Sequence, residues 1–256
     1  MRTRSVHGGR HELGQNFLIH RPTIRAIVDL IAETEGPILE IGPGDGALTV
    51  PLSRLGRAVR AVEIDEHRAA ALRSRLPGVD VRAADALRTP FDRPVIVGNL
   101  PFHLTTPLLR RLLSSGTWRH AVLLTQWEVA RKRAAVGGTT MMTAQTSPWF
   151  TFALRGRVPR SAFRPAPSVD GGILDIRRRP EPLLPASERR RYEAFVHHAF
   201  TDPGRDLRRA LRNGPAGDRG RVDRALAVAG IPRDARARDL DAARWASLWR
   251  ALGASR

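Results

Sequence analysis

Short runs of β-branched and other apolar residues alternate along this chain with stretches whose apolar residues recur at helical spacing. The runs, at 37–41, 59–64, 79–83, 94–98 and 121–125, have the length and composition of buried strands. Helical spacing precedes them at 23–32 and separates them at 47–55, 66–75 and 106–113. Such alternation predicts an α/β fold in which helices wrap a parallel sheet.

The pattern changes after residue 148. Apolar segments at 149–158 and 172–177 suit an antiparallel pair that closes the edge of the sheet, and the Pro-rich stretch 161–170 between them predicts a loop. Three prolines in Arg-Pro-Glu-Pro-Leu-Leu-Pro follow residue 178 and mark a domain boundary, since proline continues neither strand nor helix. We expect a basic flexible arm at 1–15, an α/β domain at 16–179 and a small all-α domain at 180–256.

Composition points to a polyanionic partner. Lys and Arg total 43 against 25 Asp and Glu, a formal charge of +18, and Lys132 is the single lysine. Guanidinium groups bind phosphate through two parallel hydrogen bonds, so the excess favours nucleic acid. The chain has no cysteine, no run long enough to span a membrane and no apolar signal core near its start, which predicts a cytoplasmic protein without membrane association.

A glycine-rich turn follows the first strand. Ile38 to Ala47 reads as a strand, then Gly42, Gly44 and Gly46 at alternating positions, then a helix. Alternating glycines let a ligand approach the main chain. Glu63 ends the next strand about 20 residues after the turn, where a carboxylate accepts both ribose hydroxyls. The pattern indicates a cofactor that contains a nucleoside.

The charge around this turn separates two cofactor classes. Carboxylates gather at the strand ends, at Glu40, Asp45, Glu63, Asp65 and Asp85. A dinucleotide pyrophosphate would be repelled there, so the cluster favours a cation such as the sulfonium of S-adenosylmethionine. Asp85 could accept the adenine amino group of the cofactor, or could cap a helix that begins after it.

The segment Asn99-Leu100-Pro101-Phe102 follows the fourth strand and carries the sharpest chemical signal. An exocyclic adenine amine is a poor nucleophile because its lone pair is delocalised into the ring. The Asn99 side-chain carbonyl and the Leu100 main-chain carbonyl could accept its two N–H groups and turn that lone pair towards a methyl donor. Pro101 fixes the backbone direction, and Phe102 could stack on the extruded base.

Several basic residues are candidates for RNA contact. Arg160 and Arg164 flank Phe163, the interleaving of cations and an aromatic ring that single-stranded RNA binding uses. A second candidate is the run Arg131, Lys132 and Arg133 on a helix expected at 126–133, which could equally be a solvated face. The histidines lack metal-ligand spacing, so we expect no metal site.

Six ordered motifs resemble the ribosomal RNA adenine N6-methyltransferases, which include the erythromycin-resistance (Erm) enzymes and the housekeeping small-subunit dimethyltransferases. The motifs are Gly14 to Leu18, Glu40 to Gly46, Glu63 to Asp65, Asp85-Ala86, Asn99 to Phe102 and Phe163 to Asp170. The resemblance implies a Rossmann-like methyltransferase domain followed by a small helical domain.

The resemblance also implies site residues. S-adenosylmethionine would be contacted by Asn16, Leu18, Gly42, Gly44, Glu63, Ile64, Asp85, Ala86 and Asn99. The target adenine would be held by Asn99, Leu100, Pro101 and Phe102, with Phe163 covering its other face. From the residues alone, Gln15, Asn16 and Phe17 would instead be the lead into a helix, with Phe17 in the core.

Details of the sequence favour the Erm branch. Three segments look more like the Erm branch than the housekeeping one: Leu124 to Arg133, Gly137 to Thr140 and Ser147 to Phe150. Phe102 and His103 look like Erm enzymes of antibiotic-producing actinomycetes. That branch implies methylation of one 23S rRNA adenine at the macrolide site, which blocks binding of macrolides, lincosamides and streptogramin B. Ribosomal RNA is therefore the expected partner, and a monomer is the default expectation.

Three alternatives stay open at this point. A housekeeping 16S rRNA dimethyltransferase would share every catalytic residue. A nucleotide-cofactor oxidoreductase would explain the glycine turn and Glu63, but neither Asn99 to Phe102 nor the charge. A non-catalytic RNA-binding assembly factor would explain the charge alone.

Overall fold

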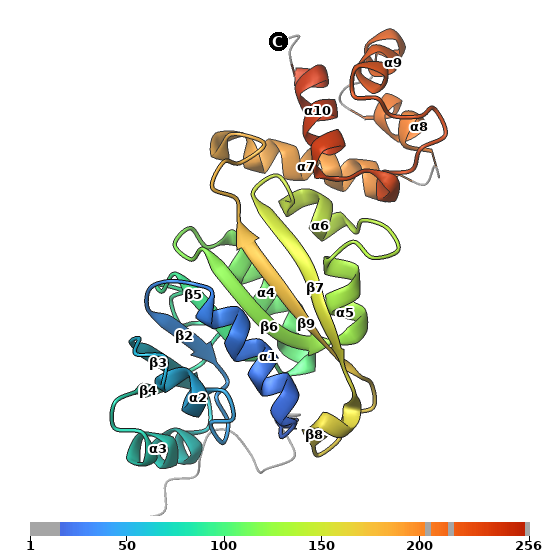
Figure 1. Ribbon diagram of the computed structural model, residues 1–256. Coiled ribbons are helices and arrows are strands. Elements are labelled where there is room, and N and C mark those ends of the chain that lie inside the picture. Colours follow the sequence, from blue (N-terminus) through green and yellow to red (C-terminus); the bar gives the residue numbers. More distant parts are fainter. Residues whose placement is uncertain (1–15, 203–205, 215–217, 254–256) are drawn as a thin grey trace, which may run out of the picture. The chain divides into compact units, whose positions relative to one another are not determined.

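A computed structural model describes residues 16–202, 206–214 and 218–253 of the chain, and Figure 1 shows their arrangement. The arm expected at 1–15 lies outside these residues. The described residues form two compact units, one of residues up to 130 with 153–177, the other of 131–152 with the residues from 178 onward.

A seven-stranded sheet organises the first unit. Its order is β4-β3-β2-β5-β6-β9-β7; the strands from β4 to β6 run parallel, and β9 is antiparallel to β6. The strands are β2 (Ile38–Ile41), β3 (Val59–Glu63), β4 (Asp80–Ala83), β5 (Val95–Asn99), β6 (His120–Gln126), β7 (Phe150–Val158) and β9 (Gly171–Arg178). The predicted α/β fold class is confirmed, and the strand bounds agree with the sequence pattern to within two residues.

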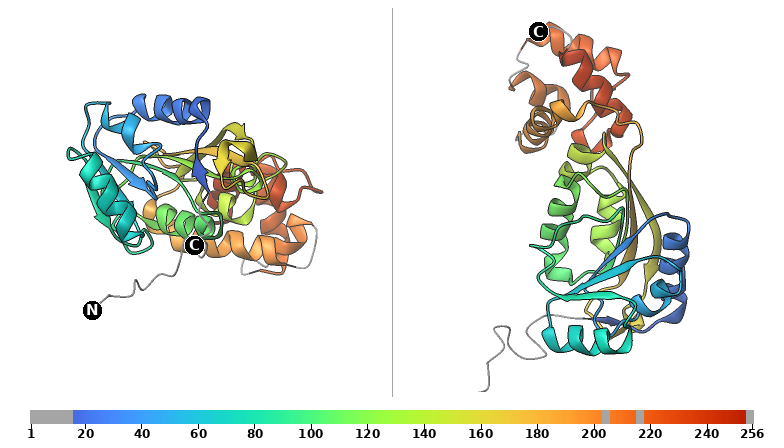
Figure 2. Two further views of the ribbon diagram at one scale, coloured as in Figure 1. Left: turned by 90° about the horizontal axis from the view of Figure 1, so that it is seen from below. Right: turned by 90° about the vertical axis from the view of Figure 1, so that its left-hand side faces the viewer.

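Helices precede and separate the strands of the sheet, as the periodicity predicts. They are α1 (Arg21–Ala32), α2 (Thr49–Ser53), α3 (Glu66–Arg75), α4 (Thr105–Ser114) and α5 (Trp127–Arg133). Figures 1 and 2 show α1 and α4 on opposite faces of the sheet. Because both faces are covered, the central strands β2 and β5 bury nearly every side chain, including Ile38, Leu39 and Ile96.

The sequence predicted a loop at 161–170, and this prediction is wrong for part of the stretch. After a 3-10 turn (Arg160–Ala162), β8 (Phe163–Arg164) pairs antiparallel with β1 (Phe17–Leu18), with Phe17 opposite Arg164 and Leu18 opposite Phe163. The interpretation of residues 15–17 as the lead into a helix is likewise wrong for Phe17, which lies in a strand and is half-buried. Two-residue strands have no periodicity, so only their pairing reveals them.

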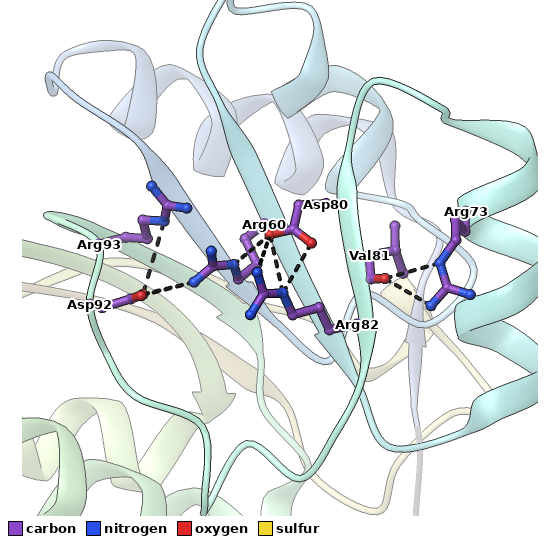
Figure 3. Close-up of polar contacts among 7 residues, drawn as sticks. All are labelled: Arg60, Arg73, Asp80, Val81, Arg82, Asp92 and Arg93. Atoms are coloured by element: carbon purple, nitrogen blue, oxygen red, sulfur yellow. Dashed lines mark hydrogen bonds and ion pairs between the residues drawn. The ribbon is translucent and has the colours of Figure 1, made fainter.

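Charged side chains protect the β4 edge of the sheet (Figure 3). Arg60 donates to Asp80 at 2.7 Å and to Asp92 at 2.9 Å, and Arg82 donates to Asp80 at 3.0 Å. Arg73 donates through two nitrogens to the Val81 carbonyl, at 2.9 and 3.2 Å. The bonds from Arg73 occupy one backbone carbonyl of the edge strand, and the charged side chains on and beside β4 make this edge less suited to pairing with another strand.

The second unit is helical. It contains α6 (Met141–Thr146), α7 (Arg189–Thr201), α8 (Leu207–Arg212), α9 (Arg219–Val228) and α10 (Ala242–Gly253), with 3-10 turns at Ala186–Glu188 and Ala237–Asp239. Trp149, Tyr192, Phe195, Phe200, Trp245 and Trp249 pack against one another, with ring centroids 5.3 to 6.5 Å apart. These rings supply the core of a unit whose helices are short.

Residues 131–152 group with these helices, although the sequence pattern placed them in the α/β domain. Hydrogen bonds explain the grouping: the Tyr192 hydroxyl donates to the Ala144 carbonyl at 2.9 Å, and the Thr139 N–H to the Arg238 carbonyl at 2.8 Å. The division at residues 179 and 180 into folding domains stays a prediction. Within the described residues, no helix is both long and apolar enough to cross a bilayer.

A buried carboxylate joins β6, β7 and β9. Asp175 is 2% exposed and accepts hydrogen bonds from His120 Nε2 at 2.6 Å and from Arg155 Nη2 at 2.6 Å. Burial alone would raise the pKa of Asp175, but the hydrogen bonds from His120 and Arg155 outweigh it and lower the pKa to about 2.

We therefore expect Asp175 to make folding sensitive to acid. Its pKa rises from about 2 in the folded state to the ordinary 3.8 on unfolding, so its stabilisation is complete above about pH 4 and disappears as the pH falls towards 2. Asp175→Asn should remove about 2 kcal/mol of this pH dependence, measured by urea unfolding between pH 6 and pH 2.5. Identical pH profiles for variant and wild type would refute this assignment.

Candidate active site

A cavity opens at the carboxyl ends of β2, β3 and β5, the edge at which open parallel sheets bind ligands. Its walls come from β1, the glycine turn and the segment after β5. The lining residues are Asn16, Phe17, Leu18, Ile19, Glu40, Gly42, Pro43, Gly44, Asp45, Ala47, Leu48, Glu63, Asn99, Leu100, Pro101 and Phe102. The structure thus brings together most of the residues that the sequence assigned to a cofactor and an adenine.

The glycine turn needs its glycines. Gly42 and Gly44 have φ of 65° and 53°, in the left-handed region that side chains disfavour. A Cβ on Gly44 would lie 2.9 Å from the Phe17 ring, so the main chain here passes directly under β1. The Gly42 N–H donates to the Val62 carbonyl at 2.9 Å and ties the turn to β3.

Glu63 is fixed by backbone donors. Its side chain is 2% exposed; Oε2 accepts the Gly44 N–H at 2.9 Å and Oε1 the Asp65 N–H at 3.1 Å. Each carboxylate oxygen has a second lone pair, so both can still accept a ligand hydroxyl. This geometry suits the ribose of a nucleoside.

Glu40 lies deeper in the same cavity. It is 1% exposed, and Oε2 has no hydrogen-bond partner among the described residues. Burial raises the pKa of Glu40 to about 8; the Thr49 hydroxyl opposes the rise and the Glu63 carboxylate adds to it. A cation bound between Glu40 and Glu63 would favour ionisation of the Glu40 carboxyl, so the pair suits a cationic ligand.

Asn99 is oriented by the N-terminal segment. Its Nδ2 donates to the Asn16 carbonyl at 2.7 Å, so Oδ1 remains the acceptor of the amide. The next residue is anchored too, because the Leu100 N–H donates to the Leu124 carbonyl at 2.9 Å. Phe102 meets Phe163 edge to face with centroids 6.4 Å apart, which brings β8 to the site.

Three predicted cofactor residues do not line the cavity: Ile64, Asp85 and Ala86. Asp85 Oδ1 accepts the Leu87 N–H at 2.8 Å and so closes a turn at 86–88, not the helix that the capping alternative required. The Asp85 side chain is 36% exposed, and its other oxygen, Oδ2, lies 3.9 Å from Arg88 Nε.

The predicted RNA contacts fall in two places. Arg160 and Arg164 are exposed on either side of buried Phe163 in the first unit. The run Arg131, Lys132 and Arg133 ends α5 and belongs to the second unit.

Sequence reasoning missed the part played by Phe17. Its ring lines the cavity, and the Arg68 guanidinium lies over the ring at 4.3 Å while also pairing with Asp45. Only the family motif that contains Phe17 could have indicated this, because a single aromatic residue before a helix is usually core.

Comparison with known proteins places these features in context. The sequence profile described as "Ribosomal RNA adenine dimethylase" matches residues 6–252. The chain is 56% identical over 208 residues to an rRNA adenine N-6-methyltransferase of Corynebacterium diphtheriae, covering 80% of this chain and 82% of that protein.

Two further similarities extend over nearly the whole chain. Mycinamicin-resistance protein MyrB of Micromonospora griseorubida is 47% identical over 247 residues, 95% of this chain and 79% of MyrB. The crystal structure of 23S rRNA methyltransferase ErmE superposes with a TM-score of 0.82 at 36% identity, covering 93% of this chain and 100% of that one.

Glu40 should make stability fall as the pH rises. Its pKa drops from about 8 in the folded state to the ordinary 4.5 on unfolding, so folding binds a proton and loses stability from pH 4.5 towards pH 8. Glu40→Gln should abolish this decline in urea unfolding between pH 5 and pH 8. If the unfolding free energies of wild type and Glu40→Gln changed with pH in the same way, Glu40 would have to be ionised in the folded protein.

Gly44→Ala should impair ligand binding more than folding. The added Cβ must displace the Phe17 ring, so affinity for S-adenosylmethionine, measured by calorimetry, should fall at least tenfold. The positive φ should lower the free energy of unfolding by only about 1–2 kcal/mol. Gly56→Ala is the matched control, because its φ is 67° and nothing lies within 4 Å of its Cβ. Equal affinities for the two variants would contradict the close approach.

Proposed function

This chain belongs to the ribosomal RNA adenine dimethylase family, and on that premise we propose that it methylates N6 of one adenine in 23S rRNA and so confers resistance to macrolides, lincosamides and streptogramin B. Likeness to a mycinamicin-resistance protein and to a 23S rRNA methyltransferase supports this target. Family membership also decides against a nucleotide-cofactor oxidoreductase and a non-catalytic assembly factor.

S-adenosylmethionine, the methyl donor of this family, supplies a methyl group activated by a positively charged sulfur. Glu63 accepts the ribose hydroxyls through the lone pairs that Gly44 and Asp65 leave free. The Glu63 carboxylate makes the cavity attractive to a cation, and a cation bound beside Glu40 would favour the ionised form of that carboxyl. Asn16, Leu18, Gly42 and Gly44 would hold the cofactor from the cavity wall, and the family motifs add Ile64, Asp85 and Ala86 as further contacts.

The observation that carries the chemistry is the hydrogen bond from Asn99 Nδ2 to the Asn16 carbonyl, at 2.7 Å. It leaves Oδ1 of Asn99 to accept one N–H of the adenine amine, while the Leu100 carbonyl accepts the other. Two acceptors pull the amine towards tetrahedral geometry and localise its lone pair, without any strong base. Pro101 holds the Leu100 carbonyl in a defined direction because its ring fixes φ.

Aromatic side chains hold the extruded base. Phe102 stacks on one face of the target adenine, which compensates for its removal from the RNA stack. The family motif assigns the other face of the base to Phe163 of β8. Their edge-to-face contact, with centroids 6.4 Å apart, keeps the two rings close together in the absence of RNA.

Arginines beside these rings bind the RNA backbone. Arg160 and Arg164 are exposed next to Phe163, where permanent charge meets the phosphates of the extruded strand. Arg131, Lys132 and Arg133 provide further phosphate contacts from the second unit. We propose that the enzyme acts in the cytoplasm, where ribosomes lie, and that it works as a monomer.

Methyl transfer to protein-free rRNA tests this function. Wild-type enzyme should transfer labelled methyl from S-adenosylmethionine to 23S rRNA and not to 16S rRNA, with the label on one adenine at the macrolide site. Asn99→Ala should lower the rate at least 100-fold, since it removes an acceptor that acts on the reacting amine.

Label on 16S rRNA alone would contradict the 23S assignment and favour the housekeeping dimethyltransferase. Asn99→Ala at the wild-type rate would contradict the role of the amide. RNA affinity of the variant, measured by filter binding, serves as the control for folding and should stay within about twofold of wild type.

A further inference from the structure

An arginine and a tryptophan are stacked beside the site that this account assigns to the target adenine. Trp127 begins α5, immediately after β6, and the guanidinium carbon of Arg157 on β7 lies 5.2 Å from the centroid of its ring. That distance is within the range of a cation–π contact. Both residues belong to the first unit.

Asp170 holds both members of the stack. Its main-chain carbonyl accepts the Trp127 N–H at 2.8 Å, and its Oδ2 accepts Arg157 Nε at 2.8 Å. Its Oδ1 accepts the Arg160 N–H at 2.9 Å. The backbone bond from Arg160 and the side-chain bond from Arg157 lower the pKa of Asp170, so the carboxylate stays ionised and keeps Arg157 in place.

The arginine is fixed, yet its binding edge is open. The side chain of Arg157 is 62% exposed, and its two Nη atoms donate to no residue in the described part of the chain. An exposed ion pair contributes little to stability, so folding alone gives little reason for this arrangement. A guanidinium oriented in advance with two free nitrogens matches the fork geometry of a phosphate.

The stack lies close to the proposed chemistry. Leu124 of β6 pairs with Asn99 of β5, and Trp127 follows three residues later, about 10 Å along the strand direction. Asp170 also anchors Arg160, which begins the turn that leads to Phe163. The stack is therefore tied directly to the segment that carries the second aromatic ring.

We propose that Trp127, Arg157 and Asp170 form a binding site for the phosphate of an RNA nucleotide that flanks the target adenine. This inference rests on the proposed function. In it Arg157 contacts the phosphate, and Trp127 and Asp170 are positioning residues. The site fixes the strand next to the extruded base and so limits where the adenine can enter.

Filter binding of protein-free 23S rRNA at several salt concentrations tests the site. Arg157→Ala should weaken binding about tenfold, the effect of one charged hydrogen-bonded contact, and should reduce the slope of log Kd against log salt by about one. Arg157→Lys should lie in between because it keeps the charge and loses the fork. Trp127→Leu should weaken binding in the same direction, because Arg157 loses its support.

Arg82→Ala is the matched control, at the opposite edge of the same sheet (Figure 3). Arg82 also lies on a strand, is 53% exposed and donates Nε to an aspartate, at 3.0 Å. Its loss should leave both Kd and salt slope at the wild-type values. For all four variants, S-adenosylmethionine affinity and kcat should be unchanged, with KM for RNA raised only in the three at the stack.

The outcomes separate this inference from the function on which it rests. If wild type methylates 23S rRNA but Arg157→Ala and Arg82→Ala give the same Kd and slope, the phosphate site is refuted and the function stands. If wild type neither binds nor methylates 23S rRNA, both are refuted. A loss of kcat without a change in KM would also refute the site, because it would place Arg157 in the chemistry.

Discussion

The hydrogen bond between Asn99 Nδ2 and the Asn16 carbonyl is the interaction on which the rest of the site depends. It joins residues 83 positions apart and decides which end of the Asn99 amide faces the cavity. The same segment continues into β1, which pairs with β8 and so brings Phe163 to Phe102. One contact therefore orients the Asn99 Oδ1 acceptor and holds the segment whose pairing with β8 places Phe163 beside Phe102.

The part of the cavity proposed to bind the cofactor is shaped by two acidic side chains, Glu40 and Glu63. Glu63 is held by two backbone N–H groups, whereas Glu40 is buried with one oxygen unpartnered, and its raised pKa of about 8 keeps it protonated near neutrality. The cavity thus avoids two adjacent buried charges while it is empty of a cation. Arg157, Arg160 and Arg164 are exposed and carry positive charge on the segments around Phe163.

Much of this could be predicted from the sequence, because its signals are periodic or local. The strands, the glycine turn, Glu63 and Asn99 to Phe102 all follow from residue type and spacing. Other features depend on contacts between distant segments: the two-residue strand at Phe17, the grouping of residues 131–152 with the later helices, and the stack of Arg157 on Trp127. Asp85 shows a third case, since its bond to the Leu87 N–H closes a turn that local sequence could not distinguish from a helix start.

The function proposed for this cavity is to methylate 23S rRNA so that macrolides no longer bind the ribosome. Its most direct test is the erythromycin susceptibility of a macrolide-sensitive bacterium that expresses either the wild-type chain or Asn99→Ala at equal protein levels. The account predicts growth at high erythromycin concentrations with the wild type alone, and full susceptibility with the variant. Equal susceptibility of the two strains, with the wild-type protein folded and abundant, would contradict it.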